Sequence, residues 1–94
     1  IVAVQGDHQM LYHNSLVADD VHWIDEEPKF PLNCSAKIRY RQASQECSVI
    51  IKDDGTIKVH FSDPQRAITP GQSIVFYNND ICLGGSVIKS RANE

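Results

Sequence analysis

The residues from Ala67 to Ser86, AITPGQSIVFYNNDICLGGS, constrain the fold of this chain more than any other stretch. Two short runs, Ser73 to Tyr77 and Ile81 to Leu83, are rich in β-branched and aromatic residues, which favour strands. Between them lies Asn78-Asn79-Asp80, whose side chains favour turns and tolerate positive φ. This order of strand, turn and strand predicts a β-hairpin.

Both ends of this hairpin carry residues that shape the backbone. Pro70-Gly71 predicts a type II turn, because proline sets φ at the first central position and glycine supplies positive φ at the second. Gly84-Gly85 predicts a place where another strand or a ligand comes close, since neither residue has a side chain in the way.

Strand patterns also dominate the rest of the chain, and no window keeps apolar residues at helical spacing long enough for a helix. We expect strands at 1–5, at 15–24 with an interruption at Asp19-Asp20, at 33–42, 47–52 and 56–61, and loops at 8–14 and 25–31. Asp53-Asp54-Gly55 predicts the turn of a second hairpin. Its inward residues should be Cys47, Val49, Ile51, Ile57, Val59 and Phe61. Asp63-Pro64 should end the strand pattern, and the polar tail beyond Ile88 should fray.

Six or seven short strands with regular turns and no helices indicate an all-β fold, a small closed antiparallel β-barrel, because closure removes exposed sheet edges. At 94 residues the chain makes one small domain. No apolar run approaches the ~20 residues that span a bilayer, and no signal-peptide leader is visible, so we expect a cytoplasmic protein with no membrane contact. The apolar start at Ile1 to Val4, without Met, is typical of a domain cut from a longer chain.

Cysteine, histidine and tryptophan offer little catalytic or metal chemistry. The three cysteines have no zinc-like spacing and fall in predicted strands: Cys34, Cys47 and Cys82. We expect reduced core thiols, since a reactive cysteine would need a cationic or partly exposed setting. The four histidines are scattered, so no metal site is expected: His8, His13, His22 and His60. Trp23, beside apolar residues, should plug the core rather than stack on a ligand.

The segment from Asn33 to Gln42, NCSAKIRYRQ, carries the clearest functional pattern in the residues themselves. Strand alternation places Cys34, Ala36, Ile38 and Tyr40 on a packed face, and Ser35, Lys37, Arg39 and Arg41 on the other. Three cations spaced by ~6.6 Å spread over ~13 Å, which suits a phosphate backbone better than a single anion. The competing interpretation is a solvated face, or an edge strand protected by charge. The lack of Asp and Glu here favours binding.

Charge is segregated along the chain, although the net charge is only −3. Residues 1–27 hold six acidic and no Lys or Arg residues, a charge of −6, and residues 28–94 hold nine Lys and Arg against six acidic residues, a charge of +3. Local potential matters more than net charge for steering a polyanion, so the overall acidity does not exclude a nucleic-acid partner.

Several separated motifs resemble the C-terminal β-barrel domain of the tRNA-specific 2-thiouridylases. They are VHWID at 21–25, RYRQ at 39–42 and DPQRAITPGQSIVFYNNDICLGGSVI at 63–88. The motifs occur in the family's order and spacing and cover nearly the whole chain. The family usually carries three consecutive glycines where this chain has Gly84, Gly85 and Ser86. The resemblance implies a six-stranded barrel related to the second domain of translation elongation factors.

For the parent enzyme, the resemblance implies ATP-dependent 2-thiolation of the wobble uridine of tRNA. An N-terminal ATP-pyrophosphatase-type domain would activate the uridine, and a persulfide cysteine, supplied by a sulfur-donor protein, would deliver the sulfur. The SGGxDS nucleotide loop of that domain is absent from this chain, and the family's reactive cysteines lie outside this region. We therefore expect no catalytic residue and no bound cofactor in residues 1–94.

Three classes of function remain open, and the first is a tRNA-binding accessory domain. RNA contacts are then expected from Lys37, Arg39 and Arg41, with Gln42 as a hydrogen-bonding neighbour, while Thr69 to Gln72 should be a structural turn. The second class is a protein-interaction barrel without RNA contact. The third, a free-standing enzyme, is disfavoured because the chain has no Ser-His-Asp grouping, phosphate loop or carboxylate pair placed for acid-base chemistry.

Overall fold

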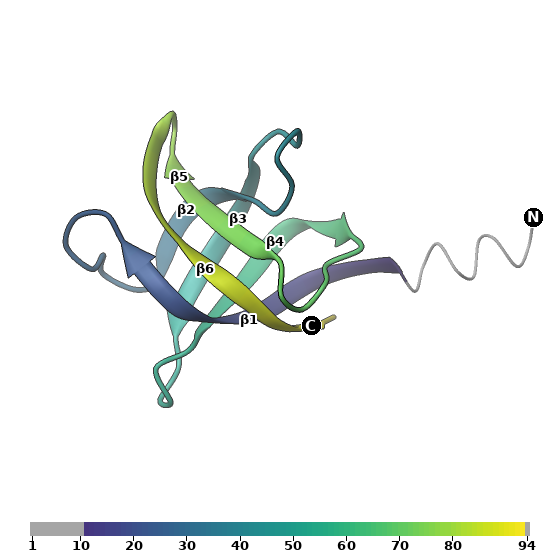
Figure 1. Ribbon diagram of the computed structural model, residues 1–94, viewed down its shortest axis with the longest axis horizontal. Coiled ribbons are helices and arrows are strands. Elements are labelled where there is room, and N and C mark those ends of the chain that lie inside the picture. Colours follow the sequence, from purple (N-terminus) through teal and green to yellow (C-terminus); the bar gives the residue numbers. More distant parts are fainter. Residues whose placement is uncertain (1–10, 94) are drawn as a thin grey trace, which may run out of the picture.

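The computed structural model describes residues 11–93, and within them the chain forms six β-strands (Figure 1). The strands are β1 (Tyr12–Trp23), β2 (Leu32–Lys37), β3 (Gln45–Ile51), β4 (Ile57–Arg66), β5 (Ser73–Asn78) and β6 (Ile81–Ala92). They close a barrel in the order β1-β4-β3-β2-β5-β6, with β6 pairing back to β1. All neighbouring pairs are antiparallel, which confirms the predicted fold class. The first strand expected at 1–5 lies outside the described residues.

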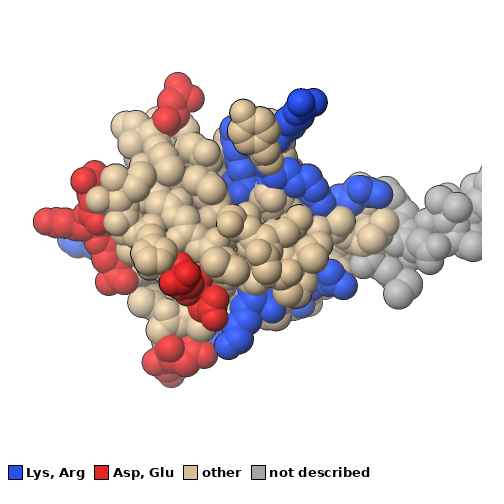
Figure 2. All heavy atoms as spheres, in the orientation of Figure 1, with Lys and Arg blue, Asp and Glu red and all other residues tan. Residues whose placement is uncertain are grey.

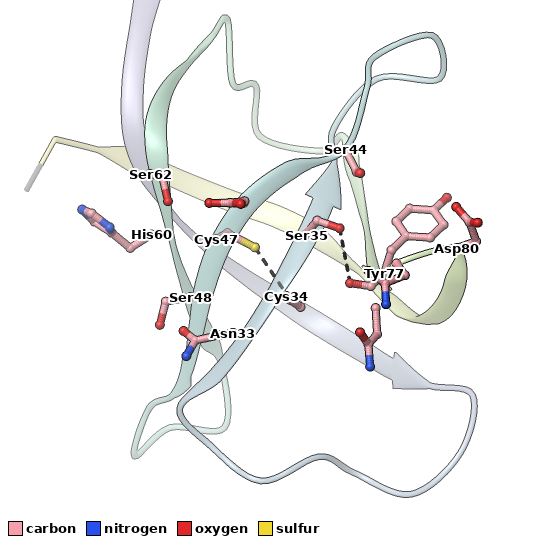
Figure 3. A pocket seen from close by; sticks show the side chains of 13 residues that line it. Asn33, Cys34, Ser35, Ser44, Cys47, Ser48, His60, Ser62, Tyr77 and Asp80 are labelled. Carbon is pink, nitrogen blue, oxygen red and sulfur yellow. Dashed lines mark hydrogen bonds between the residues drawn. The ribbon is translucent and has the colours of Figure 1, made fainter.

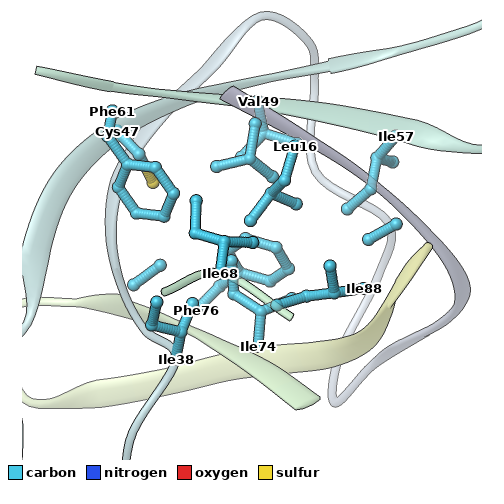
Figure 4. Packing of buried hydrophobic residues seen from close by; sticks show 13 residues of the cluster. Leu16, Ile38, Cys47, Val49, Ile57, Phe61, Ile68, Ile74, Phe76 and Ile88 are labelled. Atoms are coloured by element: carbon cyan, nitrogen blue, oxygen red, sulfur yellow. The ribbon is translucent and has the colours of Figure 1, made fainter. Parts of the chain in front are cut away.

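The barrel interior holds a single apolar core to which all six strands contribute (Figure 4). Its buried members are Leu16, Ala18, Ala36, Ile38, Cys47, Val49, Ile57, Val59, Phe61, Ile68, Ile74, Phe76 and Ile88. Trp23 packs against this core, with its ring centroid 5.6 Å from that of Phe76 and 6.2 Å from that of Phe30. The prediction that Trp23 plugs the core is confirmed.

The central hairpin forms as expected from β5 and β6, joined at Asn79-Asp80. Asn79 has φ of 56° and Gly71 has φ of 93°, which are the positive values that these turn residues accommodate. Gly84 lies opposite Trp23 of β1, where a Cβ atom would lie 2.2 Å from the backbone oxygen of His22. The close strand approach expected at Gly84-Gly85 is therefore confirmed, and the approaching strand is β1.

Ser86 stands where the resembling family usually has a third glycine, and it does not have positive φ. Its side chain is buried and its hydroxyl donates a hydrogen bond to the backbone oxygen of Asp19 at 2.5 Å. That oxygen lies where the β1–β6 register shifts, between Asp19 and His22, next to Asp20 with φ of 52°. The interruption expected at Asp19-Asp20 is thus a bulge within one continuous strand, and Ser86 stabilises it.

Outside the segment 33–42, four local expectations are wrong, and tertiary pairing explains three of them. Strand β1 already begins at Tyr12, β4 continues through Asp63-Pro64 to Arg66, and β6 continues to Ala92. Each extension pairs with a neighbouring strand, as Tyr12 does with Arg66. Pro64 lies where the β1–β4 register shifts, so the sheet loses no hydrogen bond through its missing N–H. The fourth is Ile51, which was expected inside but is 47% exposed beside the projecting β3–β4 turn.

Candidate nucleic-acid interface

The RYRQ motif lies in a turn and not in a strand, so the predicted strand over 33–42 is wrong beyond Lys37. The Gln42 amide donates to the Arg39 backbone oxygen at 3.2 Å, which places Tyr40 and Arg41 at the two central positions of the turn. The alternation that held through Ile38, which is buried as predicted, therefore ends at Tyr40. The basic side chains do not form the flat ladder that a continued strand would have produced.

The side chain of Gln42 holds this turn from within. Its Oε1 accepts a hydrogen bond from the Ile38 amide at 3.1 Å, and its Nε2 donates to Oε1 of Gln65 at 2.7 Å. Gln65 is 4% exposed and donates through its own Nε2 to the Asp63 backbone oxygen at 2.8 Å. Because these contacts occupy both Oε1 and Nε2 of the Gln42 side chain, Gln42 fixes the loop to β4.

Arg39 is anchored to the segment that follows β4. Its guanidinium donates to the backbone oxygens of Arg66 and Ala67, the latter at 3.1 Å. Ala67 has φ of 55°, so the chain turns sharply here, and its amide donates to the Leu11 backbone oxygen at 2.6 Å. A guanidinium has five N–H donors in a fixed plane, so Arg39 keeps donors for an anion while these contacts orient it.

Tyr40 is 95% exposed, which overturns the expectation that its ring fills the barrel. The reason is the turn: at its tip, side chains no longer alternate between the two faces of a sheet. Arg41 beside it is also exposed. No Gly, Pro, Asn, Asp or Ser lies between Lys37 and Ala43, so the usual turn residues that would have revealed the RYRQ turn in the sequence are missing.

A hollow of about 400 Å³ lies between this loop and the outer face of β5. Its lining residues are Lys37, Ile38, Arg39, Tyr40, Gln72, Ser73, Val75 and Tyr77. The Lys37 ammonium lies 5.3 Å from the Tyr77 ring centroid, within cation–π range. The structure thus brings Lys37 and Arg39 together, as their sequence spacing predicted, and adds two tyrosines that the sequence interpretation had not assigned to this surface.

The Thr69 to Gln72 turn has the structural role that was expected. The backbone amide of Gln72 donates a hydrogen bond to the Thr69 backbone oxygen at 3.1 Å, and its side-chain Oε1 accepts one from the Thr69 backbone amide, also at 3.1 Å. It is pinned to β6 by hydrogen bonds from Gly71 to Ile88 and from Ile88 to Gln72, both of 2.8 Å. Gln72 nevertheless also lines the hollow beside Arg39.

Charge is divided between the two ends of the molecule (Figure 2). In this view most of the Lys and Arg side chains lie on the right-hand half, and the Asp and Glu side chains lie toward the left, with a basic side chain among them. The segment from Lys37 to Gln45 contains no acidic residue. A polyanion approaching this half therefore meets a local positive potential despite the net charge of −3.

Within residues 11–93, no three His, Cys, Asp or Glu side chains come together as a metal-binding group. The same residues include no helix long and apolar enough to cross a membrane.

Comparison with known proteins gives consistent matches. A family model described as the aminomethyltransferase beta-barrel domain matches residues 13–88. The tRNA-specific 2-thiouridylase MnmA of Ruthia magnifica subsp. Calyptogena magnifica is 57% identical over 91 residues, covering 97% of this chain and 25% of the relative. Proteins of the same name are 54% identical over 90 residues in Francisella philomiragia and 52% identical over 93 residues in Vibrio campbellii, covering 94% and 97% of this chain and 25% of each relative. The chain thus spans about a quarter of the length of these relatives.

Proposed function

Because the chain belongs to the family of aminomethyltransferase β-barrel domains, in the form carried by tRNA-specific 2-thiouridylases, we propose that it is the tRNA-contacting C-terminal barrel of such an enzyme. In this proposal the whole cytoplasmic enzyme thiolates the wobble uridine of tRNA. Its N-terminal catalytic domain uses ATP and a persulfide that a sulfur-donor protein supplies. This chain has no SGGxDS loop, so its residues do not fit an ATP site and no catalytic step is assigned to them.

The observation that carries the RNA-binding role is the outward turn Arg39-Tyr40-Arg41. Two cations flank an aromatic ring that is 95% exposed, a combination that contacts nucleic-acid phosphates and stacks on an unpaired base. Because the exposed Tyr40 ring is not part of the barrel core, it is available to stack on a base. Lys37, Arg39 and Arg41 serve as phosphate contacts, and Gln42 holds the turn that presents them.

The first test compares tRNA binding by two charge reversals. Arg41→Glu changes an exposed cation in the proposed interface, whereas Lys52→Glu makes the same charge change beside the β3–β4 turn, at the opposite end of strand β3. We expect Arg41→Glu to weaken the affinity for labelled tRNA by roughly 10-fold, because one phosphate contact is lost and repulsion replaces it. Lys52→Glu should stay close to the unchanged protein, which controls for net charge.

Arg39 is not used for that comparison, because its guanidinium also holds the Arg66 and Ala67 carbonyls. A substitution there would disturb the loop as well as any RNA contact. Equal affinities for Arg41→Glu, Lys52→Glu and the unchanged protein would remove the RNA-binding role of this turn.

The alternative in that event is a protein-interaction barrel, which a second surface favours. Ile24 is 65% exposed and Ile81 is 67% exposed, and the Ile24 amide donates to the Leu83 oxygen at 2.9 Å, so the two isoleucines belong to adjoining segments. The acidic residues Asp25, Glu26 and Glu27 follow Ile24 directly. Exposed isoleucines on adjoining segments, followed by acidic residues, suit a basic protein partner.

A further inference from the structure

Two of the three cysteines face each other across neighbouring strands. Cys34 of β2 is the direct register partner of Cys47 of β3, and their Sγ atoms lie 3.8 Å apart (Figure 3). Directly opposed residues of an antiparallel pair have Cα atoms about 4.5 to 5.5 Å apart, which lies within the range that a disulfide spans. Both thiols are free in the structure, and the bond requires that the sulfur atoms approach to about 2.05 Å with a Cβ–S–S–Cβ dihedral angle of about 90°.

The two thiols differ in exposure and in acidity. Cys34 is half-buried, whereas Cys47 is 6% exposed and belongs to the core. With Cys47 as donor, the hydrogen bond between them lowers the pKa of Cys34, and the same bond together with burial raises the pKa of Cys47. Cys34 is therefore the sulfur that carries negative charge more readily, and Cys47 supplies a proton beside it.

A small reagent has a route to this pair. Both cysteines line an open hollow of about 820 Å³ on the barrel, together with polar residues such as Ser35, Ser48 and His60. Figure 3 shows the pair between the side chains that surround this hollow. A half-buried thiol that lines an open hollow next to a second thiol has the geometry of an oxidation site with a resolving partner.

We propose that Cys34 and Cys47 form a reversible dithiol–disulfide site that hydrogen peroxide oxidises. The Cys34 thiolate attacks one peroxide oxygen, the O–O bond breaks, and the departing oxygen takes up a proton and leaves as water, with Cys34 as the sulfenic acid. The Cys47 sulfur then attacks the Cys34 sulfur and the S–O bond breaks. The hydroxyl leaves with the Cys47 proton as a second water. The dithiol loses two electrons and two protons, and the peroxide is reduced to two waters.

The position of the bond in the fold gives it a structural consequence. Cys34 and Cys47 are 13 residues apart, and the segment between them includes the Arg39 to Gln42 turn. The disulfide joins β2 to β3 at the base of this loop, and residues 34–47 then form a covalently closed ring. Cys82 lies in β6 and remains the single free thiol.

The test is oxidation of the 94-residue chain with stoichiometric hydrogen peroxide, followed by thiol counting and tryptic mass mapping. We expect free thiols to fall from three to one, and dithiothreitol to restore all three. Trypsin cleaves after Arg39 and Arg41, between the two cysteines, so the disulfide is identified as a Cys34 peptide linked to a Cys47 peptide. A linkage through Cys82, an intermolecular dimer, or three unreacted thiols would overturn the proposal.

Single substitutions separate the roles of the two sulfurs. Cys34→Ser should slow peroxide consumption at least 10-fold, and Cys47→Ala should stop the reaction at a Cys34 sulfenic acid that dimedone traps. Cys82→Ser is the matched control and should form the Cys34–Cys47 bond at an unchanged rate. Equal rates for Cys34→Ser and Cys82→Ser would show that Cys34 is not the attacking thiol. Circular dichroism of each variant establishes that the barrel has formed before rates are compared.

Discussion

At the residue scale, Tyr40 allows RNA binding to be tested separately from core packing. Because its ring is 95% exposed, we expect Tyr40→Ala to change the free energy of unfolding by no more than about 0.5 kcal/mol, as for ordinary surface substitutions. The contrasting change is Phe76→Ala, which removes a fully buried ring and should cost about 3 to 5 kcal/mol. Urea unfolding followed by far-UV circular dichroism measures both.

The same Tyr40→Ala variant should lose affinity for tRNA, since stacking on one base contributes about 1 to 3 kcal/mol. An unchanged affinity together with unchanged stability would leave the exposed ring without a role in RNA binding.

Among the glycines of residues 11–93, Gly84 has the least room for a side chain. An alanine Cβ would lie 2.2 Å from the His22 oxygen and 3.0 Å from the Trp23 Cα, and both are backbone atoms that cannot rotate away. We expect Gly84→Ala to lower the free energy of unfolding by at least about 3 kcal/mol, through displacement of β1 from β6.

The matched control for this change is Gly55→Ala in the β3–β4 turn. Gly55 has φ of 85° but no atom within 4 Å of the added Cβ, so only the backbone strain of about 1 to 2 kcal/mol applies. Similar losses for the two variants in chemical unfolding would mean that strain, and not the close approach of β1, accounts for the glycine.

At the scale of the element, the β3–β4 hairpin depends on the Asp54 carboxylate. Its Oδ1 accepts hydrogen bonds from the Thr56 hydroxyl at 2.6 Å and the Thr56 amide at 3.0 Å, and these bonds lower the pKa of Asp54 from its ordinary value of 3.8. A folded-state pKa below the unfolded one stabilises the protein above the unfolded pKa. This stabilisation disappears as the pH falls through the folded pKa.

We therefore expect Asp54→Ala to lower the melting temperature at neutral pH, with a difference from the unchanged protein that shrinks as the pH falls below about 4. Asp53→Ala removes the neighbouring exposed carboxylate and is the matched control. Thermal unfolding over a pH series measures both variants. A difference that persists at low pH would assign the effect to hydrogen bonds that the neutral carboxyl also accepts, and not to the charge.

Local residue patterns predicted the interiors of the elements better than their ends. The β3–β4 and β5–β6 hairpins have turn residues in their own sequences, and both formed as expected. The extensions of β4 past Pro64 and of β6 to Ala92 depend on pairing with β1, which is distant in sequence. The RYRQ turn was missed because a contact with a residue distant in sequence holds it: Gln42 donates a hydrogen bond to Gln65 of β4.

At the scale of the whole molecule, the separation of charge determines how salt affects RNA binding. If Lys37, Arg39 and Arg41 are the phosphate contacts, the logarithm of the tRNA association constant should fall with the logarithm of salt concentration with a slope of about −2 to −3. Arg41→Glu should reduce the magnitude of this slope by about 1, whereas Lys52→Glu should leave it unchanged. Filter binding over a salt series provides the slopes. Identical slopes for the three proteins would place the contacts elsewhere.

Turn residues, strand periodicity and motif order along the chain were enough to predict the all-β class, the two hairpins, the alternation that buries residues such as Val49 and Phe61, and the family. The ends of the strands, the side chains of the basic segment that point outward and the pairing of the cysteines could be known only from the folded barrel. Each of these depends on contacts between residues distant in sequence: Gln42 with Gln65, Arg39 with Ala67, and Cys34 with Cys47. Strand pairing and packing between elements create these contacts, so periodicity along one strand contains no information about them.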